Sequence, residues 1–229
     1  QTVTGVQTCA LPICYGLGAV PLARCLARAG ADMLAVYEPA EAEQLAADGV
    51  ETPMLMFMPV RGLDPSEALL AHARRGRLHL AVHDLAQIEA LDNWAGASAL
   101  TLPVQLYLDT GMSRAGLRPG QLTEALGRVH RASSLKLAGV YSHLATADAD
   151  PTFADTQRHR FEHALSQHAA ALPAGLTRHL ANSFATLRGQ RFHFDMVRPG
   201  LGLLGYGPEL MPASASDAGS NPGLEPVMR

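Results

Sequence analysis

The feature that most constrains the fold is a series of short apolar runs that recur along the 229 residues, at spacings of roughly 20 to 40 positions. Within each run the apolarity is continuous rather than alternating, which is what parallel strands covered on both faces require. We therefore expect each run to form a buried strand of a parallel sheet. The seven runs are Met33–Tyr37, Met54–Met58, Leu78–Val82, Val104–Leu108, Leu137–Ser142, His179–Ala181 and Met196–Arg198.

Helix-like segments lie between these runs, and several begin with proline or a short polar residue, as helices commonly do. Strands that alternate with helices predict βαβ units and, at this length, an α/β barrel of the TIM (β/α)8 type. Such a barrel needs eight strands, and the missing one would be the first, because a helix is already expected at Ala19. The predicted helices are Ala19–Ala29, Pro39–Ala47, Pro65–Arg74, Leu85–Trp94, Pro119–Arg131, Phe153–Ala171 and Phe184–Arg188.

The charge and hydropathy of the chain argue against two classes of partner. A net charge of −3 provides no basic surface for nucleic acid or for an anionic membrane. No stretch reaches the roughly 18 uninterrupted apolar residues that a membrane span needs. No basic segment followed by an apolar one marks a signal peptide. We therefore expect neither a nucleic-acid nor a membrane partner.

The cysteines and histidines do not predict a metal site. The three cysteines, Cys9, Cys14 and Cys25, are odd in number and match no metal-ligand spacing. This usage favours a reducing compartment, the cytoplasm. His159 and His163 are four residues apart on a predicted helix, but their charged surroundings (QRHRFEH) are typical of a solvated face.

The composition changes after Tyr206. Residues Glu209–Pro222 are rich in serine, alanine, proline and glycine and have little to bury, which is typical of a linker. The last residues, Gly223–Arg229 (GLEPVMR), look like the start of a further unit. The predicted barrel therefore ends before this linker.

Six motifs in a fixed order point to one protein family. They are Tyr15–Gly18 (YGLG), Asp109–Gly116 (DTGMSRAG), Ser142–Asp148 (SHLATAD), His179–Ser183 (HLANS), Phe194–Gly200 (FDMVRPG) and Gly223–Met228 (GLEPVM). With these motifs, about residues 14–229 resemble the pyridoxal-phosphate-dependent alanine racemases of fold type III. One motif alone would be weak, whereas six in register are specific. The resemblance implies an N-terminal barrel that holds the cofactor, followed by a C-terminal β domain.

The start of the chain departs from this family. The resemblance places the cofactor-binding lysine four residues before Tyr15, where this chain has Leu11. We interpret Val3–Ile13 (VTGVQTCALPI) as a translated sequencing adapter, to be set aside as foreign sequence. The chain is then expected to be a fragment truncated at both ends, lacking the native first strand and the C-terminal β domain. The expected divisions are 1–13, the foreign segment; 14–208, the cofactor-binding barrel; and 209–229, the linker and the start of the missing domain.

A barrel without its first strand would have two open edges, and open edges favour aggregation. The segment Val6–Ile13 is apolar enough to take the place of the missing strand, although Pro12 has no backbone N–H to donate to a neighbouring strand. We expect the isolated chain to be poorly stable.

The resemblance assigns two arginines to the reaction site. Arg114 would bind the substrate, because a planar donor fork suits a carboxylate. Arg198 would donate to the pyridine nitrogen of the cofactor, which leaves the ring unprotonated and a weaker electron sink. The alternatives are an ordinary loop arginine at Arg114 and a salt-bridged arginine at the end of a strand at Arg198.

Four further residues match the family's phosphate-binding site, where a hydroxyl, backbone N–H groups and a phenol converge on one anion. They are Tyr15, Ser183, Gly200 and Leu201. The loops after strands seven and eight of TIM barrels often bind phosphate, which suits Ser183 and Gly200. A serine after asparagine and a glycine after proline are also ordinary cap and turn residues, and Leu201 stands where the family usually has isoleucine.

Two histidines are expected at the ends of strands near this site. The resemblance implies that His143 orients the arginine that faces the pyridine ring. His179 is assigned to the cofactor site, with a satisfied core histidine as the alternative. Tyr107 stands where many family members have a modified lysine that holds the substrate arginine, so Arg114 would need another support, such as a chloride or a neutral polar group.

The function implied is interconversion of L- and D-alanine, which supplies D-alanine for the cell wall, by a cytoplasmic homodimer with pyridoxal phosphate. The two proton-transferring groups of the family are the lysine of strand one and a tyrosine of the partner's C-terminal domain. We expect this chain to have neither and to be inactive. Its one lysine, Lys136, would lie at the opposite end of the barrel. The alternative function is that of the single-barrel, non-catalytic pyridoxal-phosphate homeostasis proteins.

Overall fold

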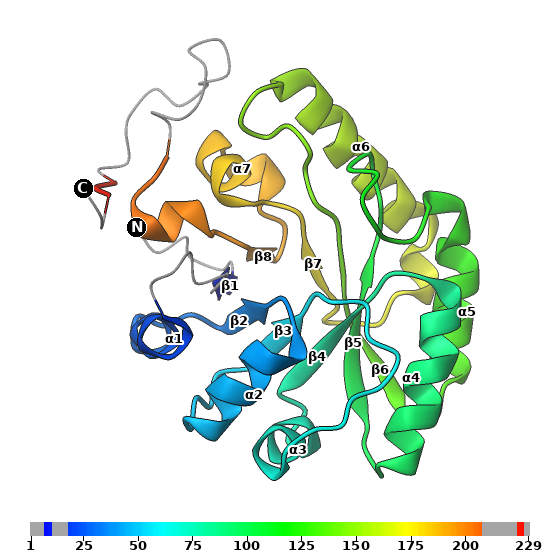
Figure 1. Ribbon diagram of the computed structural model, residues 1–229. Coiled ribbons are helices and arrows are strands. Elements are labelled where there is room, and N and C mark those ends of the chain that lie inside the picture. Colours follow the sequence, from blue (N-terminus) through cyan, green and yellow to red (C-terminus); the bar gives the residue numbers. More distant parts are fainter. Residues whose placement is uncertain (1–6, 11–17, 208–223, 227–229) are drawn as a thin grey trace.

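The computed structural model describes residues 7–10, 18–207 and 224–226. Eight parallel strands pair in chain order and form a closed barrel, with β8 returning to β1. Figure 1 shows the helices arranged around these strands. The TIM-type barrel predicted from the apolar runs is confirmed. The strands are β1 (Gln7–Ala10), β2 (Met33–Val36), β3 (Met54–Met56), β4 (Leu78–Val82), β5 (Leu102–Tyr107), β6 (Leu135–Tyr141), β7 (Thr177–His179) and β8 (Met196–Val197).

The helices match the predicted segments to within a few residues. They are α1 (Ala19–Arg28), α2 (Pro39–Ala47), α3 (Glu67–Arg74), α4 (Leu85–Ala97), α5 (Leu122–Arg131), α6 (Pro151–Gln167) and α7 (Ser183–Arg188), with 3-10 turns η1 (Pro119–Gln121), η2 (Ala169–Ala171), η3 (Gln190–Phe192) and η4 (Leu201–Leu204). Side-chain caps set several of the starts, since Ser66, Asp84 and Asn182 each accept a hydrogen bond from a backbone N–H of the first turn. No helix in the described part of the chain is long and apolar enough to cross a membrane.

The first barrel position is filled by a strand from the segment that the sequence interpretation treats as foreign. Residues Gln7–Ala10 pair with β2 through Cys9 and Met33, and with β8 through Thr8 and Val197. The edge expected to be open between β2 and β8 is therefore closed. The pairing of β1 agrees with the expectation that the apolar segment around Cys9 can take the place of the missing first strand.

The core has two parts that the barrel wall separates. Inside the barrel, Cys9, Met33, Leu55, Tyr107 and Tyr141 belong to one buried cluster. A larger cluster lies between the outer face of the strands and the helices, as in other barrels of this type. Strands buried on both faces explain why the apolar runs of the sequence are continuous.

The position of β1 can be tested by thiol labelling. Cys9 is fully buried, and burial raises the pKa of its thiol to about 12, whereas Cys25 is exposed. We expect the native chain near neutral pH to react with iodoacetamide at Cys25 at least tenfold faster than at Cys9, because the thiolate is the reacting species. Peptide mass analysis measures both sites, and urea should equalise them. Equal labelling in the native chain would show that Cys9 is not inside the barrel.

Candidate functional site

The candidate site lies at the carboxyl ends of the strands, where TIM barrels build their active sites. The DTGMSRAG motif forms a tight loop there, directly after β5. Asp109 accepts hydrogen bonds from the N–H groups of Gly111 and Ser113, at 2.9 and 3.0 Å. A Cβ on Gly116 would lie 3.0 Å from the carbonyl oxygen of Tyr107, so a glycine lets the loop return against the strand. This folding places Arg114 beside the barrel mouth.

Arg198 is the central cation of this mouth. It directly follows β8, and only 1% of its surface is exposed. Its Nη2 donates to the carbonyl oxygens of Ser142 and Leu180, at 2.6 and 3.4 Å. Its guanidinium carbon lies 5.3 Å from the centre of the Tyr141 ring. Among the described residues no carboxylate forms an ion pair with Arg198, so the salt-bridged alternative is not what the structure has.

The histidine that orients Arg198 is His179, and the expectation that His143 does so is not what the structure has. Nη1 of Arg198 donates to Nδ1 of His179 at 2.7 Å, and no ring hydrogen bond joins His143 to Arg198 within the described ranges. The reason is topological, because Arg198 follows β8, His179 ends the neighbouring strand β7, and His143 follows β6. His179 is fully buried.

His143 lies within the electrostatic field of both site arginines. Burial, together with the charges of Arg198 and Arg114, lowers the pKa of His143 to about 3. The ring is therefore neutral at physiological pH. The structure thus gathers three of the predicted residues, His143, Arg198 and Arg114, around one positively charged region that suits an anion.

The rings of Tyr107 and Tyr141 are stacked face to face inside the barrel, next to the site. Their rings stack with centroids 4.8 Å apart, and Tyr141 stacks in turn on His179 at 5.0 Å. The Tyr107 hydroxyl is buried, and its neighbour among the described residues is the side chain of Arg114, which lies near it without forming a hydrogen bond of full geometry. Burial raises the pKa of Tyr107, and the charge of Arg114 partly offsets that effect. What supports Arg114 in place of the family's modified lysine remains a prediction.

The predicted phosphate-binding residues come together at the start of α7. The Ser183 hydroxyl accepts hydrogen bonds from the N–H groups of Gly200 and Gly202, at 2.8 and 3.0 Å. Leu201 lies between these two glycines at the start of η4. Both amides donate to Ser183 in this structure, and rotation of the Ser183 hydroxyl would free them, so that two amides and a hydroxyl on adjacent loops could bind a phosphate. Leu11 and Tyr15 lie outside the described residues.

Lys136 lies where the sequence predicts, far from the mouth. It is the second residue of β6 and pairs with Pro103 near the start of β5. His143 follows the other end of the same strand. The separation of seven residues corresponds to roughly 23 Å of extended chain, several times the length of a lysine side chain.

Two polar residues inside the barrel were missed in reading the sequence. Gln105 hydrogen-bonds to His179 through Oε1 at 2.6 Å and to Nδ1 of His79 through Nε2 at 3.1 Å. A glutamine within the apolar run VQLYL was the available signal, because an uncharged polar residue in a buried strand needs partners.

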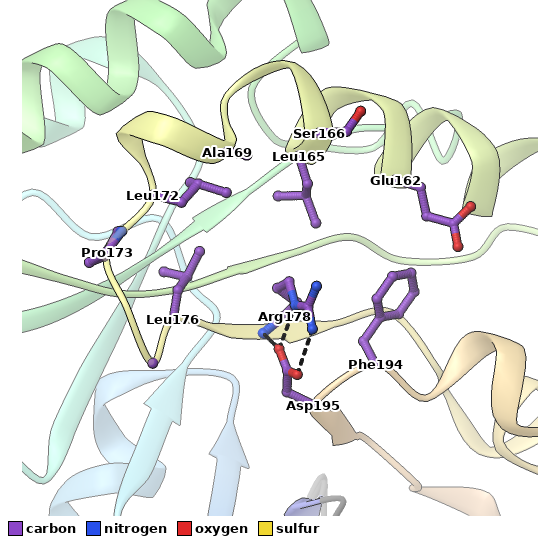
Figure 2. A pocket seen from close by; sticks show the side chains of 11 residues that line it. Glu162, Leu165, Ser166, Ala169, Leu172, Pro173, Leu176, Arg178, Phe194 and Asp195 are labelled. Atoms are coloured by element: carbon purple, nitrogen blue, oxygen red, sulfur yellow. Dashed lines mark hydrogen bonds and ion pairs between the residues drawn. The ribbon is translucent and has the colours of Figure 1, made fainter.

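A separate cavity of about 510 Å³ lies between α6 and the segments around the start of β7, away from the barrel mouth (Figure 2). Arg178 and Asp195 form a two-pronged ion pair in its wall, at 2.7 and 2.8 Å. Arg178 and Asp195 satisfy each other, and Glu162, which also lines the cavity, pairs with Arg158 at 2.6 Å, so each charge that the structure describes in this lining has a partner. No group of three or more metal-binding side chains occurs in the described part of the chain.

Comparisons with known proteins agree with this geometry. The family model for the alanine racemase N-terminal domain matches residues 13–208. The chain is 41% identical over 197 residues to the alanine racemase of Synechocystis sp., covering 85% of this chain and 51% of that protein. It spans about half the length of the curated relatives it matches.

The solved structures similar to this chain include further alanine racemases. The structure of an alanine racemase from Streptomyces lavendulae aligns with a TM-score of 0.81 at 30% identity, covering 92% of this chain and 56% of that one. An alanine racemase from Bartonella henselae with covalently bound pyridoxal phosphate aligns with a TM-score of 0.74 at 27% identity, covering 92% and 60%. The family match covers most of the chain and the same barrel fold recurs, so this protein belongs to the alanine racemase family through the family's N-terminal domain.

Proposed function

We propose that this chain is the cofactor-binding barrel of an alanine racemase, an isomerase that interconverts L- and D-alanine with pyridoxal phosphate. The proposal includes a homodimeric complete enzyme and a cytoplasmic location, as the family implies. The family match and the relatives named above support this function over the single-barrel homeostasis alternative. The substrate of the complete enzyme would be alanine, held by its carboxylate at Arg114.

The observation that carries the proposal is the buried, unpaired charge of Arg198. Burying a cation without a carboxylate is costly, so a protein retains such a group where the group has a use. Arg198 carries only donors; its Nη1 bonds to His179, and its Nη2 bonds to the carbonyl oxygens of Ser142 and Leu180. A ring nitrogen with a free lone pair is an acceptor that suits the remaining donors.

The residues around Arg198 fit the rest of the cofactor. Ser183 would hold the phosphate together with the amides of Gly200 and Gly202, which would exchange their bonds to the Ser183 hydroxyl for bonds to the phosphate; Leu201 contributes to the same turn. When bound, pyridoxal phosphate withdraws electrons from the α-carbon of an amino acid. Arg198 keeps its own protons because a guanidinium does not deprotonate at neutral pH, so the ring nitrogen gains none from it. We assign His143 and His179 to the surroundings of this ring.

No side chain among the described residues offers a primary amine at the barrel mouth. The single lysine of the chain is Lys136, at the other end of β6. We propose that Leu11 stands at the position of the family's lysine and that Tyr15 belongs to the phosphate site. We therefore expect the 229-residue chain to bind the cofactor weakly and without a covalent bond, and to be inactive.

Equilibrium dialysis with pyridoxal phosphate tests this function. We expect the full chain to bind pyridoxal phosphate at least tenfold more tightly than pyridoxal, which lacks the phosphate. Arg198→Met and Ser183→Ala should each weaken binding by roughly tenfold or more, the cost of losing a hydrogen bond to a charged group. Circular dichroism checks that both variants fold.

The matched control is Ser166→Ala, which changes a serine in the wall of the separate cavity and should leave binding unchanged. Equal affinity for pyridoxal and pyridoxal phosphate would contradict the phosphate site. Binding that survives Arg198→Met without loss would contradict the role given to the buried guanidinium.

A further inference from the structure

We propose that Gln105 and His79 are positioning residues for Arg198, acting through a one-way chain of hydrogen bonds that crosses the barrel interior and fixes His179 as a neutral acceptor. The inference rests on the proposed function for its importance, since Arg198 is the group expected to face the cofactor ring. Its geometry is independent of any ligand. The chain of contacts begins at the mouth with Arg198 and ends near the floor of the barrel at Gly76.

The contacts form an unbroken series. Nη1 of Arg198 lies 2.7 Å from Nδ1 of His179, and Nε2 of His179 lies 2.6 Å from Oε1 of Gln105. Nε2 of Gln105 lies 3.1 Å from Nδ1 of His79. The backbone carbonyl of Gly76 then interacts with the His79 ring as an acceptor. Four strands, β8, β7, β5 and β4, supply or directly precede the four side chains.

Chemistry at the Arg198 end leaves only one direction for this series. A guanidinium has donors and no acceptor, so Nδ1 of His179 must be unprotonated and the proton must sit on Nε2. Nε2 of His179 then donates to Oε1 of Gln105, which turns the amide nitrogen of Gln105 towards His79. That amide nitrogen donates, so Nδ1 of His79 accepts and the proton of His79 sits on Nε2. The orientation of Gln105 thus follows from Arg198 and sets the tautomer of His79.

An extra proton would break the series. If His179 were protonated, a second N–H at Nδ1 would face the N–H of Arg198, and the two donors would repel. The environment acts in the same direction, because burial lowers the pKa of His179 well below its usual range and lowers that of His79 to about 4. Head-to-tail hydrogen bonds in a low-dielectric interior also strengthen one another. The chain thus holds Arg198 in place without adding a charge beside it.

A glycine in β6 makes room for this arrangement. Gln105 on β5 must reach His179 on β7, and β6 lies between these strands. Gly139 pairs with Gln105 on one side and Thr177 on the other. A Cβ on Gly139 would lie 2.9 Å from the carbonyl oxygen of Thr177 and 3.0 Å from Oε1 of Gln105. The absence of a side chain at Gly139 therefore opens the path for the glutamine.

Histidine tautomers in the full chain without cofactor test the proposal directly. Two-bond 1H–15N correlation spectra of the 15N-histidine-labelled chain distinguish Nε2–H, Nδ1–H and doubly protonated rings, with assignments from single His→Asn variants. We expect His179 and His79 to be neutral Nε2–H tautomers throughout the range from pH 5.5 to 8. An Nδ1–H tautomer at His179, or titration of its ring near the ordinary pKa, would overturn the proposal.

Gln105→Met keeps the size of the side chain and removes its polar atoms. The matched control is Gln87→Met, because Gln87 is also fully buried and its amide donates to the carbonyls of Val60 and Ala81, outside the series. We expect Gln105→Met to shift the ring signals of His179 and His79 and to weaken pyridoxal phosphate binding about fivefold or more. Gln87→Met should leave both unchanged.

Unchanged His179 signals in a folded Gln105→Met variant would overturn the proposal, as would equal effects of the two variants. If Gln105→Met does not fold, the tautomers of the unaltered chain still decide it. If the tautomers are as expected but the unaltered chain binds no pyridoxal phosphate, the hydrogen-bond chain stands and the proposed function fails.

Discussion

Lowering the pH from about 7.5 to 5.5 is expected to reduce the free energy of unfolding of this chain by roughly 4 kcal/mol or more, because His79, His143 and His179 are neutral in the folded state. Burial lowers the pKa of His79 to about 4, that of His143 to about 3, and that of His179 well below its usual range. Burial also lowers the pKa of His72 and of His83, so both add to the loss in the same direction. In the unfolded chain each ring regains a pKa of about 6.5.

The sign follows from counting protons. Below pH 6.5 the unfolded chain binds more protons than the folded chain, so stability rises with pH. Each histidine with a lowered pKa contributes stability that is fully present above about pH 6.5 and is lost as the pH falls towards its folded pKa. Between pH 7.5 and 5.5 the loss is about 1.4 kcal/mol for each of His79, His143 and His179. For a domain with roughly 5–15 kcal/mol of stability, this loss is large.

Urea unfolding at the two pH values measures this effect. His79→Gln removes one titrating ring and keeps a side chain that can both accept and donate, so it should reduce the pH-dependent loss by about 1.4 kcal/mol. His130→Gln, at an exposed position of α5, should leave the loss unchanged. A free energy of unfolding that changes by less than about 1 kcal/mol between the two pH values would contradict the burial of these rings in neutral form.

The barrel could be predicted from sequence because the signals for its strands are local. A run such as Met54–Met56 is apolar on both faces, and only a parallel sheet under helices buries both. The end of β5 was harder to place, since Leu108 is as apolar as the strand before it but bridges to Leu117 in the returning loop instead. For β1 the sequence predicted only that the barrel needs a further strand between β2 and β8. Nothing in Gln7–Ala10 itself specifies pairing with these two strands.

The candidate site was predictable only where residues follow a strand. Arg198, Ser183 and Gly200 were assigned to the site by the resemblance, and because they follow β8 and β7 the structure has them at the same end of the barrel; their roles stay predictions. The partnership of Arg198 with His179 rather than His143 depends on which strands are neighbours in space. The bond between Gln105 and His179 spans 74 positions of the sequence, and no local pattern encodes such a pair.

The second large effect concerns covalent capture of the cofactor. Reduction with borohydride in the presence of equimolar pyridoxal phosphate is expected to leave no stoichiometric pyridoxyl adduct on Lys136. This lysine is exposed near the start of β6, at the opposite end of the barrel from Ser183 and Arg198. It can react only as an ordinary surface amine, without help from a phosphate-binding site. Digestion and peptide mass analysis measure the extent of modification.

Leu11→Lys supplies an amine at the position that we assign to the family's lysine. We expect this variant to give a nearly stoichiometric adduct at residue 11, because a bound phosphate holds the aldehyde at high effective concentration. Adding Lys136→Arg to this variant should leave the adduct unchanged, whereas adding Arg198→Met or Ser183→Ala should reduce it severalfold. A stoichiometric adduct on Lys136 in the unaltered chain would contradict the placement of the site at the carboxyl ends of the strands. No adduct at residue 11 in the folded variant would contradict the assignment of Leu11.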